Sequence, residues 1–374
     1  MIADQVIEGR ILTPEGFISG RIQIDEGRIQ LIEGEPIATS RVLQEPGAIV
    51  LPGFIDTHVH GGAGYDIMQG KDAANHVARC HARHGTTALL ATTMTAPMAD
   101  IENALRSLAP ACQKRPAKGA RVLGVHLEGP YINSGKLGAQ PPFATLLSIQ
   151  QVQTLHALAP IRLITLAPQL PGHLACIGPL SDSGFRVKIG HTAGSYEQGL
   201  AALQQGASGF THLFNAMSGL HHRTPGMVGA ALAHARFAEI IPDLLHVHPG
   251  AIKAAARAIP CLFCVTDSTS ATDMPDGDYS LGQQRVFKCL GGVRLADGTL
   301  AGSVLTMDQA LRNLVEIGMN LDDASKMVST HAADYLGCNE WGRLTTGTFA
   351  DLVVMDQALN LERVFIEGTE IDIH

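Results

Sequence analysis

The sequence lacks the features that would place this protein on a nucleic acid or in a membrane. Its 374 residues include 27 Lys and Arg against 35 Asp and Glu, and no run of basic residues occurs. A net charge of −8 gives no electrostatic support for binding nucleic acid or an anionic membrane surface. No apolar stretch is long enough to span a bilayer, and the first residues do not resemble a signal peptide. We therefore expect neither nucleic acid nor membrane as a partner.

Cysteines are few and show no disulfide framework. The seven cysteines are an odd number without framework spacing, which predicts reduced thiols and a cytoplasmic location. The pair Cys261 and Cys264 has the spacing of a metal or redox motif, but it lies in an apolar run without a second pair. A packing role in a strand is therefore favoured for it. Histidine, in contrast, is abundant, with 17 residues.

Short apolar strands alternate with amphipathic helices through the middle of the chain. Eight strands are expected at 53–60, 86–93, 121–128, 161–168, 185–192, 209–214, 237–243 and 262–267. Helical segments are expected at 72–84, 100–108, 149–158, 196–205, 250–258, 303–317 and 322–336. Eight strand–helix units over about 260 residues are typical of a (β/α)8 barrel of the TIM type. An open doubly wound sheet is disfavoured, because neither a Gly-rich dinucleotide fingerprint nor a phosphate-binding loop occurs.

Both ends of the chain are rich in strands instead. Apolar and polar residues alternate at 6–8, 20–25, 27–32, 350–355 and 363–368. Neither end alone would bury much surface, so we expect both to combine into one small β-sandwich domain. The expected domains are 1–48 with 343–374 for this β domain, and 49–342 for the barrel.

The carboxyl ends of the expected strands carry His and carboxylate side chains. The first strand ends in His58 and His60, which share a face because strand side chains alternate with period two. The third, fifth and sixth strands carry Glu128, His191 and His212 at or near their ends. Active sites of (β/α)8 barrels lie at these ends. Purely structural histidines would be expected to scatter along strands and helices instead.

These side chains suit a divalent metal ion, and zinc in particular. Glu128, His191 and His212 form a set of two nitrogens and one oxygen that leaves a position open for water, as catalytic zinc sites do. His58 and His60 would add a second position, with Glu128 free to bridge, so we expect one or two Zn2+ per chain. Asp267, at the end of the eighth strand, is expected to carry the proton in metal-assisted hydrolysis of an amide.

Six motifs resemble those of a known family. Residues 52–60 (PGFIDTHVH) resemble the opening motif of the amidohydrolase superfamily. The N-acetylglucosamine-6-phosphate deacetylases within it have similar motifs, here at 126–132 (HLEGPYI), 190–192 (GHT), 211–217 (THLFNAM), 265–267 (VTD) and 300–303 (LAGS). The resemblance extends from about residue 6 to 368, in the same order. It implies a (β/α)8 barrel with a small β domain, a homodimer, and release of acetate from a phosphorylated N-acetylhexosamine.

The resemblance also implies residue roles by matching position. It gives Glu128, His191 and His212 as metal ligands and Asp267 as the acid/base. Substrate contacts match Ala139, Gln140, Asn215, Ala216, Arg223, His246, Leu300, Ala301 and Gly302. Arg223 offers the bidentate fork that suits a phosphate. In the family this arginine can reach across the dimer.

The epimer at C4 of the sugar is left open, with N-acetyl-D-glucosamine 6-phosphate preferred. Many relatives have His in place of Gln140 and Asp in place of His248. Together with 219–226 (GLHHRTPG) and 274–277 (MPDG), the segment around His248 resembles the branch that acts on N-acetylgalactosamine 6-phosphate.

Two other classes of protein are disfavoured by the sequence. A cyclic-amide hydrolase of the superfamily would carry a carboxylated Lys at the end of the fourth strand, and 161–168 contains none. A non-catalytic metal-bound scaffold would be expected to have lost a ligand or the acid/base, and this chain retains all of them.

Overall fold

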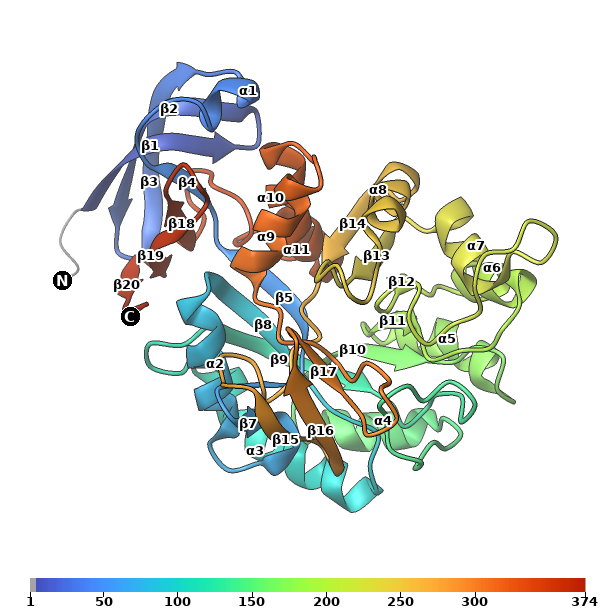
Figure 1. Ribbon diagram of the computed structural model, residues 1–374. Coiled ribbons are helices and arrows are strands. Elements are labelled where there is room, and N and C mark those ends of the chain that lie inside the picture. The colour runs from blue at the N-terminus through green and yellow to red at the C-terminus, as the bar shows by residue number, and fades with distance from the viewer. Residues whose placement is uncertain (1–4, 374) are drawn as a thin grey trace.

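The computed structural model describes residues 5–373, and it contains the expected barrel (Figure 1). Eight parallel strands lie side by side in chain order: β5 (Phe54–Val59), β8 (Thr86–Thr92), β9 (Arg121–Glu128), β10 (Ile161–Leu166), β11 (Arg186–Ile189), β12 (Gly209–Phe210), β13 (Phe237–Ile240) and β14 (Cys261–Cys264). All eight predicted strands are present, and most are shorter than predicted. Seven of them end one to four residues before the predicted position, and β9 ends at Glu128 as predicted.

The barrel closes between its first and last strands through irregular backbone. The amide of Asp267, just after β14, donates to His58 O (3.0 Å), and the amide of His60 donates to Ser268 O (2.9 Å). Every residue of β5 and β8 is buried, as expected for parallel strands covered on both faces. The closure brings Asp267 beside the two histidines of the first strand.

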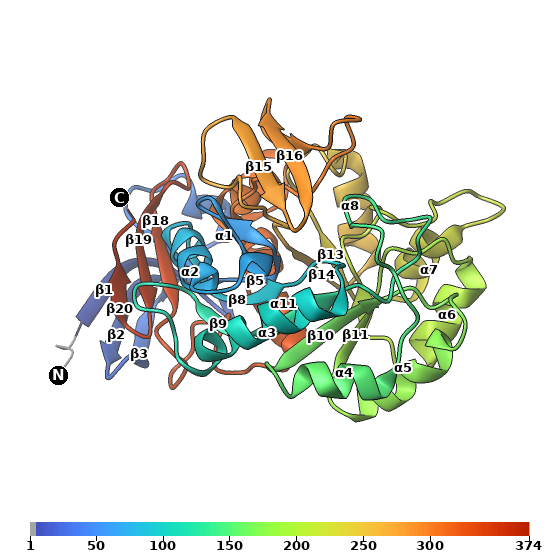
Figure 2. The same ribbon diagram turned by 90° about the horizontal axis from the view of Figure 1, so that it is seen from below.

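Helices surround the barrel strands (Figure 2). They are α2 (Ala73–Arg83), α3 (Met98–Gln113), α4 (Ile149–His156), α5 (His173–Asp182), α6 (Tyr196–Gln204), α7 (Gly226–His234), α8 (Pro249–Ala258), α9 (Met307–Glu316), α10 (Leu321–Val328) and α11 (Thr330–Leu336). The predicted helix 322–336 is two helices, interrupted at Ser329. Sequence patterns missed α5, which contains Pro179, and α7, which is apolar nearly all round and so lacks a helical period.

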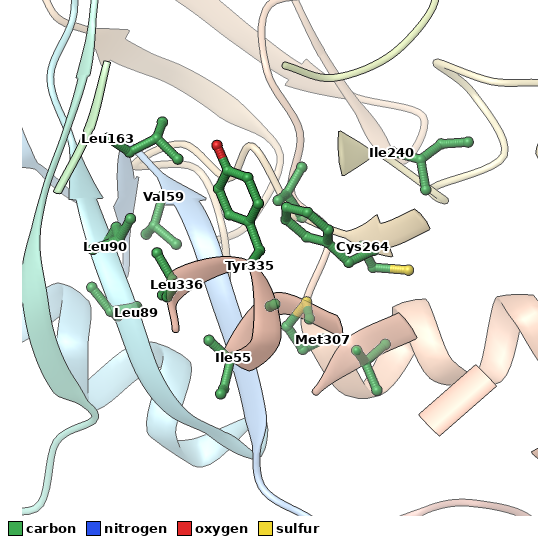
Figure 3. Packing of buried hydrophobic residues seen from close by; sticks show 14 of the residues in the cluster. Ile55, Val59, Leu89, Leu90, Leu163, Ile240, Cys264, Met307, Tyr335 and Leu336 are labelled. Carbon is green, nitrogen blue, oxygen red and sulfur yellow. The ribbon is translucent and has the colours of Figure 1, made fainter. Parts of the chain in front are cut away.

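The main hydrophobic core lies between the barrel strands and these helices. Tyr335 and Leu336 of α11 pack among Val59, Leu89 and Leu90 (Figure 3). The Tyr335 ring is fully buried, and its hydroxyl reaches Ser208 Oγ at 2.7 Å, so its polar atom is satisfied.

The expected β domain from both chain ends is a seven-stranded sheet. Its order is β20 (Thr369–Ile371), β19 (Leu361–Ile366), β18 (Leu352–Met355), β4 (Ile49–Pro52), β1 (Gln5–Thr13), β2 (Gly16–Asp25) and β3 (Arg28–Pro36). Only β1 and β4 pair in parallel, and the short helix α1 (Thr39–Val42) lies between β3 and β4. Ile11 and Ile22 share one buried cluster with Val354 and Phe365 from the other half. Because β4 belongs to this sheet, the sheet extends to Pro52.

A three-stranded antiparallel sheet follows the last barrel strand and was absent from the prediction. Its strands are β15 (Gly277–Leu281), β16 (Gln284–Cys289) and β17 (Gly292–Arg294). Figure 2 shows β15 and β16 projecting from the barrel on the side away from α4 and α5. Leu281 and Val286 form a small cluster with Met94 and Ala301. Between β5 and α2 lie the short strands β6 (Gly61–Gly62) and β7 (Tyr65–Asp66) and the 3-10 helix η1 (Ile67–Gln69). Across residues 5–373, the helices are too short or too polar to cross a bilayer.

Candidate active site

Four histidines and two carboxylates from different strand ends meet at the carboxyl end of the barrel. Glu128 Oε1 lies 3.1 Å from Nε2 of both His191 and His212. Its other oxygen, Oε2, lies 3.2 Å from Nε2 of His60 and 3.4 Å from Nε2 of His58. Glu128 therefore stands between two groups of nitrogen atoms, as the sequence predicts for a bridging carboxylate.

Asp267 completes the second group. Its Oδ1 lies 3.2 Å from Nε2 of His60 and 3.4 Å from Nε2 of His58. The ligand atoms of His58, His60 and Asp267 converge closely enough to hold one ion, as do those of Glu128, His191 and His212. Two candidate positions for an ion thus share the space around Glu128.

The outer ring nitrogens show how three of these histidines are oriented. Nδ1 of His60 lies 3.2 Å from Thr92 O, and Nδ1 of His191 lies 2.9 Å from Lys136 O. Nδ1 of His58 faces Glu239 Oε2 at 3.3 Å. Since these oxygens can only accept, each Nδ1 carries a proton, and each Nε2 faces the centre, where its lone pair would be available to a bound metal ion. Outer partners of this kind orient histidines that bind metals. The residues present therefore fit a divalent ion at both positions.

Three of the converging residues have a left-handed backbone. The φ angles of His191, His212 and Asp267 are 47°, 28° and 51°. This region is unfavourable for residues with a side chain, and such strain gathers at functional sites. Here it turns each side chain from the end of its strand toward the barrel axis.

The two carboxylates of the centre stay ionised in spite of their burial. Burial opposes ionisation of Glu128, but His58 and His191 overcome this effect and hold its pKa well below the usual range. Burial likewise opposes ionisation of Asp267, and His58 and His60 lower its pKa. Burial disfavours the charged form of His60, but Asp267 and Glu128 raise its pKa to about 9. Both carboxylates are therefore ionised at neutral pH and attract a cation.

A buried layer beneath the centre was missed by the sequence prediction. Glu239 of β13 pairs with the Lys188 ammonium of β11 and accepts a hydrogen bond from the Thr57 hydroxyl (2.7 Å). All three side chains are fully buried. One sequence feature could have indicated this layer: a Lys and a Glu lie inside short apolar strands, where parallel barrels normally hold apolar residues. The sequence does not show that they meet, since β12 lies between their strands.

A cavity of about 250 Å3 opens above the centre. His60, Glu128, His191, His212 and Asp267 line it. The predicted substrate contacts that also line it are Ala139, Gln140, Asn215, Ala216, His246, Leu300 and Gly302. Sequence reasoning did not name Met94, Gly138, Leu281 and Thr299, which line it as well. Most of the predicted residues are thus brought to one cavity.

His246 is held in this wall by an ion pair. Its Nδ1 lies 2.6 Å from Asp243 Oδ2. Burial disfavours the charged imidazole, but Asp243 raises the pKa of His246 above its usual value. His246 is therefore a positioned donor at the edge of the cavity.

Three of the predicted substrate contacts have other partners or positions than direct contact with substrate would require. His248, where many relatives have Asp, lies on the surface. The Gln140 amide donates to Glu128 Oε2 (2.7 Å) and accepts from Thr95 N (2.7 Å), so both ends of the amide serve the chain itself. Ala301 is fully buried in the cluster under the three-stranded sheet. Arg223 is exposed on the segment between β12 and α7, where it contacts His222, and does not line its own chain's cavity. His248 is the exposed N-cap of α8, accepting from Gly250 N at 3.0 Å.

The barrel and its centre of histidines and carboxylates define a class, the barrel hydrolases that work with a divalent metal ion. The model of the amidohydrolase family matches residues 49–163 and 181–371. The sequence is 40% identical to an N-acetylgalactosamine-6-phosphate deacetylase of Escherichia coli O157:H7, covering 96% of this chain and 97% of that protein. It is also 40% identical to an N-acetylglucosamine-6-phosphate deacetylase of Lysinibacillus sphaericus, covering 87% of this chain and 86% of that protein.

Solved structures of similar fold include members of the same group of deacetylases. The fold matches N-acetylglucosamine-6-phosphate deacetylase from Thermotoga maritima with a TM-score of 0.90 and 30% identity, over 98% of this chain and 99% of that one. It matches a mutant of the Mycobacterium smegmatis deacetylase, in complex with N-acetyl-D-glucosamine-6-phosphate, with a TM-score of 0.91 and 29% identity, over 98% and 99% of the two chains. The chain belongs to the amidohydrolase family and, within it, to the group of the N-acetylhexosamine-6-phosphate deacetylases.

Proposed function

We propose that this protein hydrolyses the N-acetyl amide of an N-acetylhexosamine 6-phosphate, giving the amino sugar 6-phosphate and acetate in amino-sugar catabolism. The observation that carries the proposal is the placement of Asp267 at the floor of a cavity, beside the convergent set around Glu128. Relatives of similar length, named for this reaction on two epimeric sugars, support it.

The proposed cofactor is Zn2+, one or two ions per chain. Glu128, His191 and His212 would hold the first ion, and His58, His60 and Asp267 the second, with Glu128 between them. A bound ion would polarise the amide carbonyl and lower the pKa of water to about 7. The donor set of imidazole nitrogens and carboxylate oxygens is the one that zinc prefers.

Asp267 is the proposed acid/base. Its carboxylate takes a proton from the attacking water, whose oxygen bonds to the carbonyl carbon of the acetyl group. It then gives that proton to the sugar nitrogen as the C–N bond breaks, so acetate and the free amine leave. Its lowered pKa keeps it ionised and ready to accept the proton. Asn215, His246 and the Leu300–Gly302 segment line the wall that would orient the sugar.

The proposed substrate is N-acetyl-D-glucosamine 6-phosphate, and its C4 epimer is the second candidate. The galacto candidate is supported by the relative from Escherichia coli O157:H7, which aligns over 97% of its length. We expect a higher kcat/KM for the gluco sugar when both 6-phosphates are assayed side by side on zinc-loaded enzyme. A higher value for the galacto sugar would assign the second candidate. Acetate release from neither would contradict the proposed function.

We also propose a homodimer in which Arg223 binds the phosphate in the neighbouring subunit's cavity. Arg223 is exposed and lies outside its own cavity, which supports a role in trans. Arg223→Ala is expected to raise KM for the phosphorylated sugar about 10- to 100-fold, because charge-assisted hydrogen bonds to phosphate are lost. Steady-state kinetics with the unphosphorylated sugar should change little. Arg257→Ala, an exposed arginine on α8, is the matched control.

Mixed dimers test whether Arg223 acts in trans. Chains carrying Arg223→Ala are combined with chains carrying Asp267→Asn, each inactive or weak alone. If the arginine serves the neighbouring site, the mixed dimer regains one intact site and hence activity. No regain after subunit exchange, verified by differential tags, would contradict the role in trans.

The cysteines bear on the cellular location, and the residues of the barrel bear on the two alternative functions. All seven cysteines are free, which supports the proposed cytoplasmic location. The cyclic-amide alternative would need a lysine at the end of β10, which has none. The buried Lys188 of the next strand is engaged by Glu239 instead. The scaffold alternative is disfavoured because the ligand set and Asp267 are all present and converge.

A further inference from the structure

We propose that Glu239, with Lys188 as its counter-ion, is a positioning residue for the second metal position, the one formed by His58, His60 and Asp267. The inference rests on the metal centre proposed above and assigns a role to two buried residues outside the cavity. Neither residue would touch substrate or metal. Their effect would pass through His58, which Glu239 contacts directly.

One carboxylate contacts a proposed ligand residue of each metal position. Glu239 Oε2 faces Nδ1 of His58 at 3.3 Å and accepts the backbone N–H of His212 at 3.3 Å. Its Oε1 accepts the Thr57 hydroxyl at 2.7 Å and pairs with the Lys188 ammonium. Glu239 is fully buried, so these four contacts, rather than water, satisfy its charge.

The contact with His58 sets which nitrogen points at the centre. A neutral imidazole carries one proton, and Glu239 fixes that proton on Nδ1. Nε2 then keeps its lone pair toward His60 Nε2 and Asp267 Oδ1, at 3.2 and 3.4 Å. The neighbouring His126 ring does not replace this contact. It packs edge-on against His58 with ring centroids 4.5 Å apart and bonds to Thr165 Oγ1 at 2.7 Å.

The contacts of Lys188 argue against a third metal site in this layer. His58, His126 and Glu239 also lie close enough together to hold an ion. The Lys188 ammonium already occupies the cation position at Glu239, and it lies 4.8 Å from the Phe263 ring centroid and 4.5 Å from that of Tyr335. An ammonium held by a carboxylate and two aromatic rings is well stabilised without a metal. The layer therefore supports the two positions above it.

The two positions depend on Glu239 to different degrees. At the second position it bonds to the side chain of a ligand, whereas at the first it bonds only to the backbone of His212. Loss of a partner that orients a ligand typically weakens metal binding about 10- to 100-fold. Glu239→Gln keeps an acceptor but leaves the buried Lys188 charge without its carboxylate partner. We expect the second Zn2+ to bind about 10- to 100-fold more weakly, with a smaller change in the first.

The test is a zinc titration of the full-length apoprotein against a chromophoric chelator, which gives the stoichiometry and both dissociation constants without substrate. Asp351→Asn is the matched control, because Asp351 is a buried acid paired with Arg121 (2.8 Å) at the amino end of the barrel. The control should lower the melting temperature and leave both zinc constants unchanged. Since acetate is not measured, failure here is separate from failure of the proposed function.

The double variant Lys188→Met/Glu239→Leu covers the case in which the single variant does not fold. It removes both charges together, which proteins often tolerate when volume is kept, but it still deprives His58 of its acceptor. We expect it to fold and to lose the second zinc. Two wild-type zinc constants in either folded variant would overturn the proposal, as would a wild-type protein that binds only one zinc at any concentration.

Discussion

Asp267→Asn is expected to lower kcat about 10²- to 10⁴-fold, the usual contribution of a positioned acid/base. The amide cannot take the proton from water or return it to the sugar nitrogen. The first metal position should remain, because Glu128, His191 and His212 hold it without Asp267. Acetate release and zinc content, measured on the same preparation, separate the two effects.

The matched control for this variant is Asp308→Asn. Asp308 is also buried, but it pairs with Arg312 (2.8 Å) and lies outside the cavity. This substitution is expected to lower stability and to leave kcat unchanged. Near-normal turnover by the Asp267 variant would remove Asp267 from the proposed mechanism.

Glu128→Ala is expected to abolish zinc binding at both positions and to reduce turnover to the background rate. Oε1 of Glu128 faces His191 and His212, and Oε2 faces His58 and His60. Removal of one carboxylate therefore takes an anionic ligand from two positions at once. Zinc content after dialysis at defined free zinc is the measurement.

Gln140→Leu is the comparison variant for Glu128→Ala. Gln140 supports Glu128 through Oε2 but is not itself among the converging ligands. Its loss should weaken zinc binding far less than the loss of Glu128 itself, because every converging ligand remains. Full zinc occupancy in Glu128→Ala would show that the histidines hold the ions without the shared carboxylate, contrary to the proposed centre.

The contacts of Gln140 indicate a different role from the one expected from the sequence. From sequence alone, a glutamine in place of histidine raised a question about the sugar hydroxyls. In the structure its amide is engaged by Thr95 N and Glu128 Oε2. Gln140 therefore orients Glu128, the carboxylate between the two metal positions. Any effect of Gln140 on sugar preference would be indirect, through Glu128.

Much of the fold was predictable because it depends on local patterns. Alternation of short apolar strands with amphipathic helices predicted all eight barrel strands. The three-stranded sheet β15–β17 was missed, since its strands are short and mostly half-exposed, and β15 and β17 each begin with a glycine. The helix α7 was missed because a segment apolar nearly all round has no helical period to detect.

The sequence by itself determined the barrel, the domain built from both chain ends, and the residues offered at the strand ends. Period two placed His58 and His60 on one face, and parallel strands brought Glu128, His191 and His212 to the same end. Only the tertiary structure decided that Arg223 lies outside its own cavity. It also decided that Glu239 lies under His58, a residue 181 positions away in the chain. Such contacts join strands that are distant in sequence, and no local pattern encodes which buried charge will face which ligand.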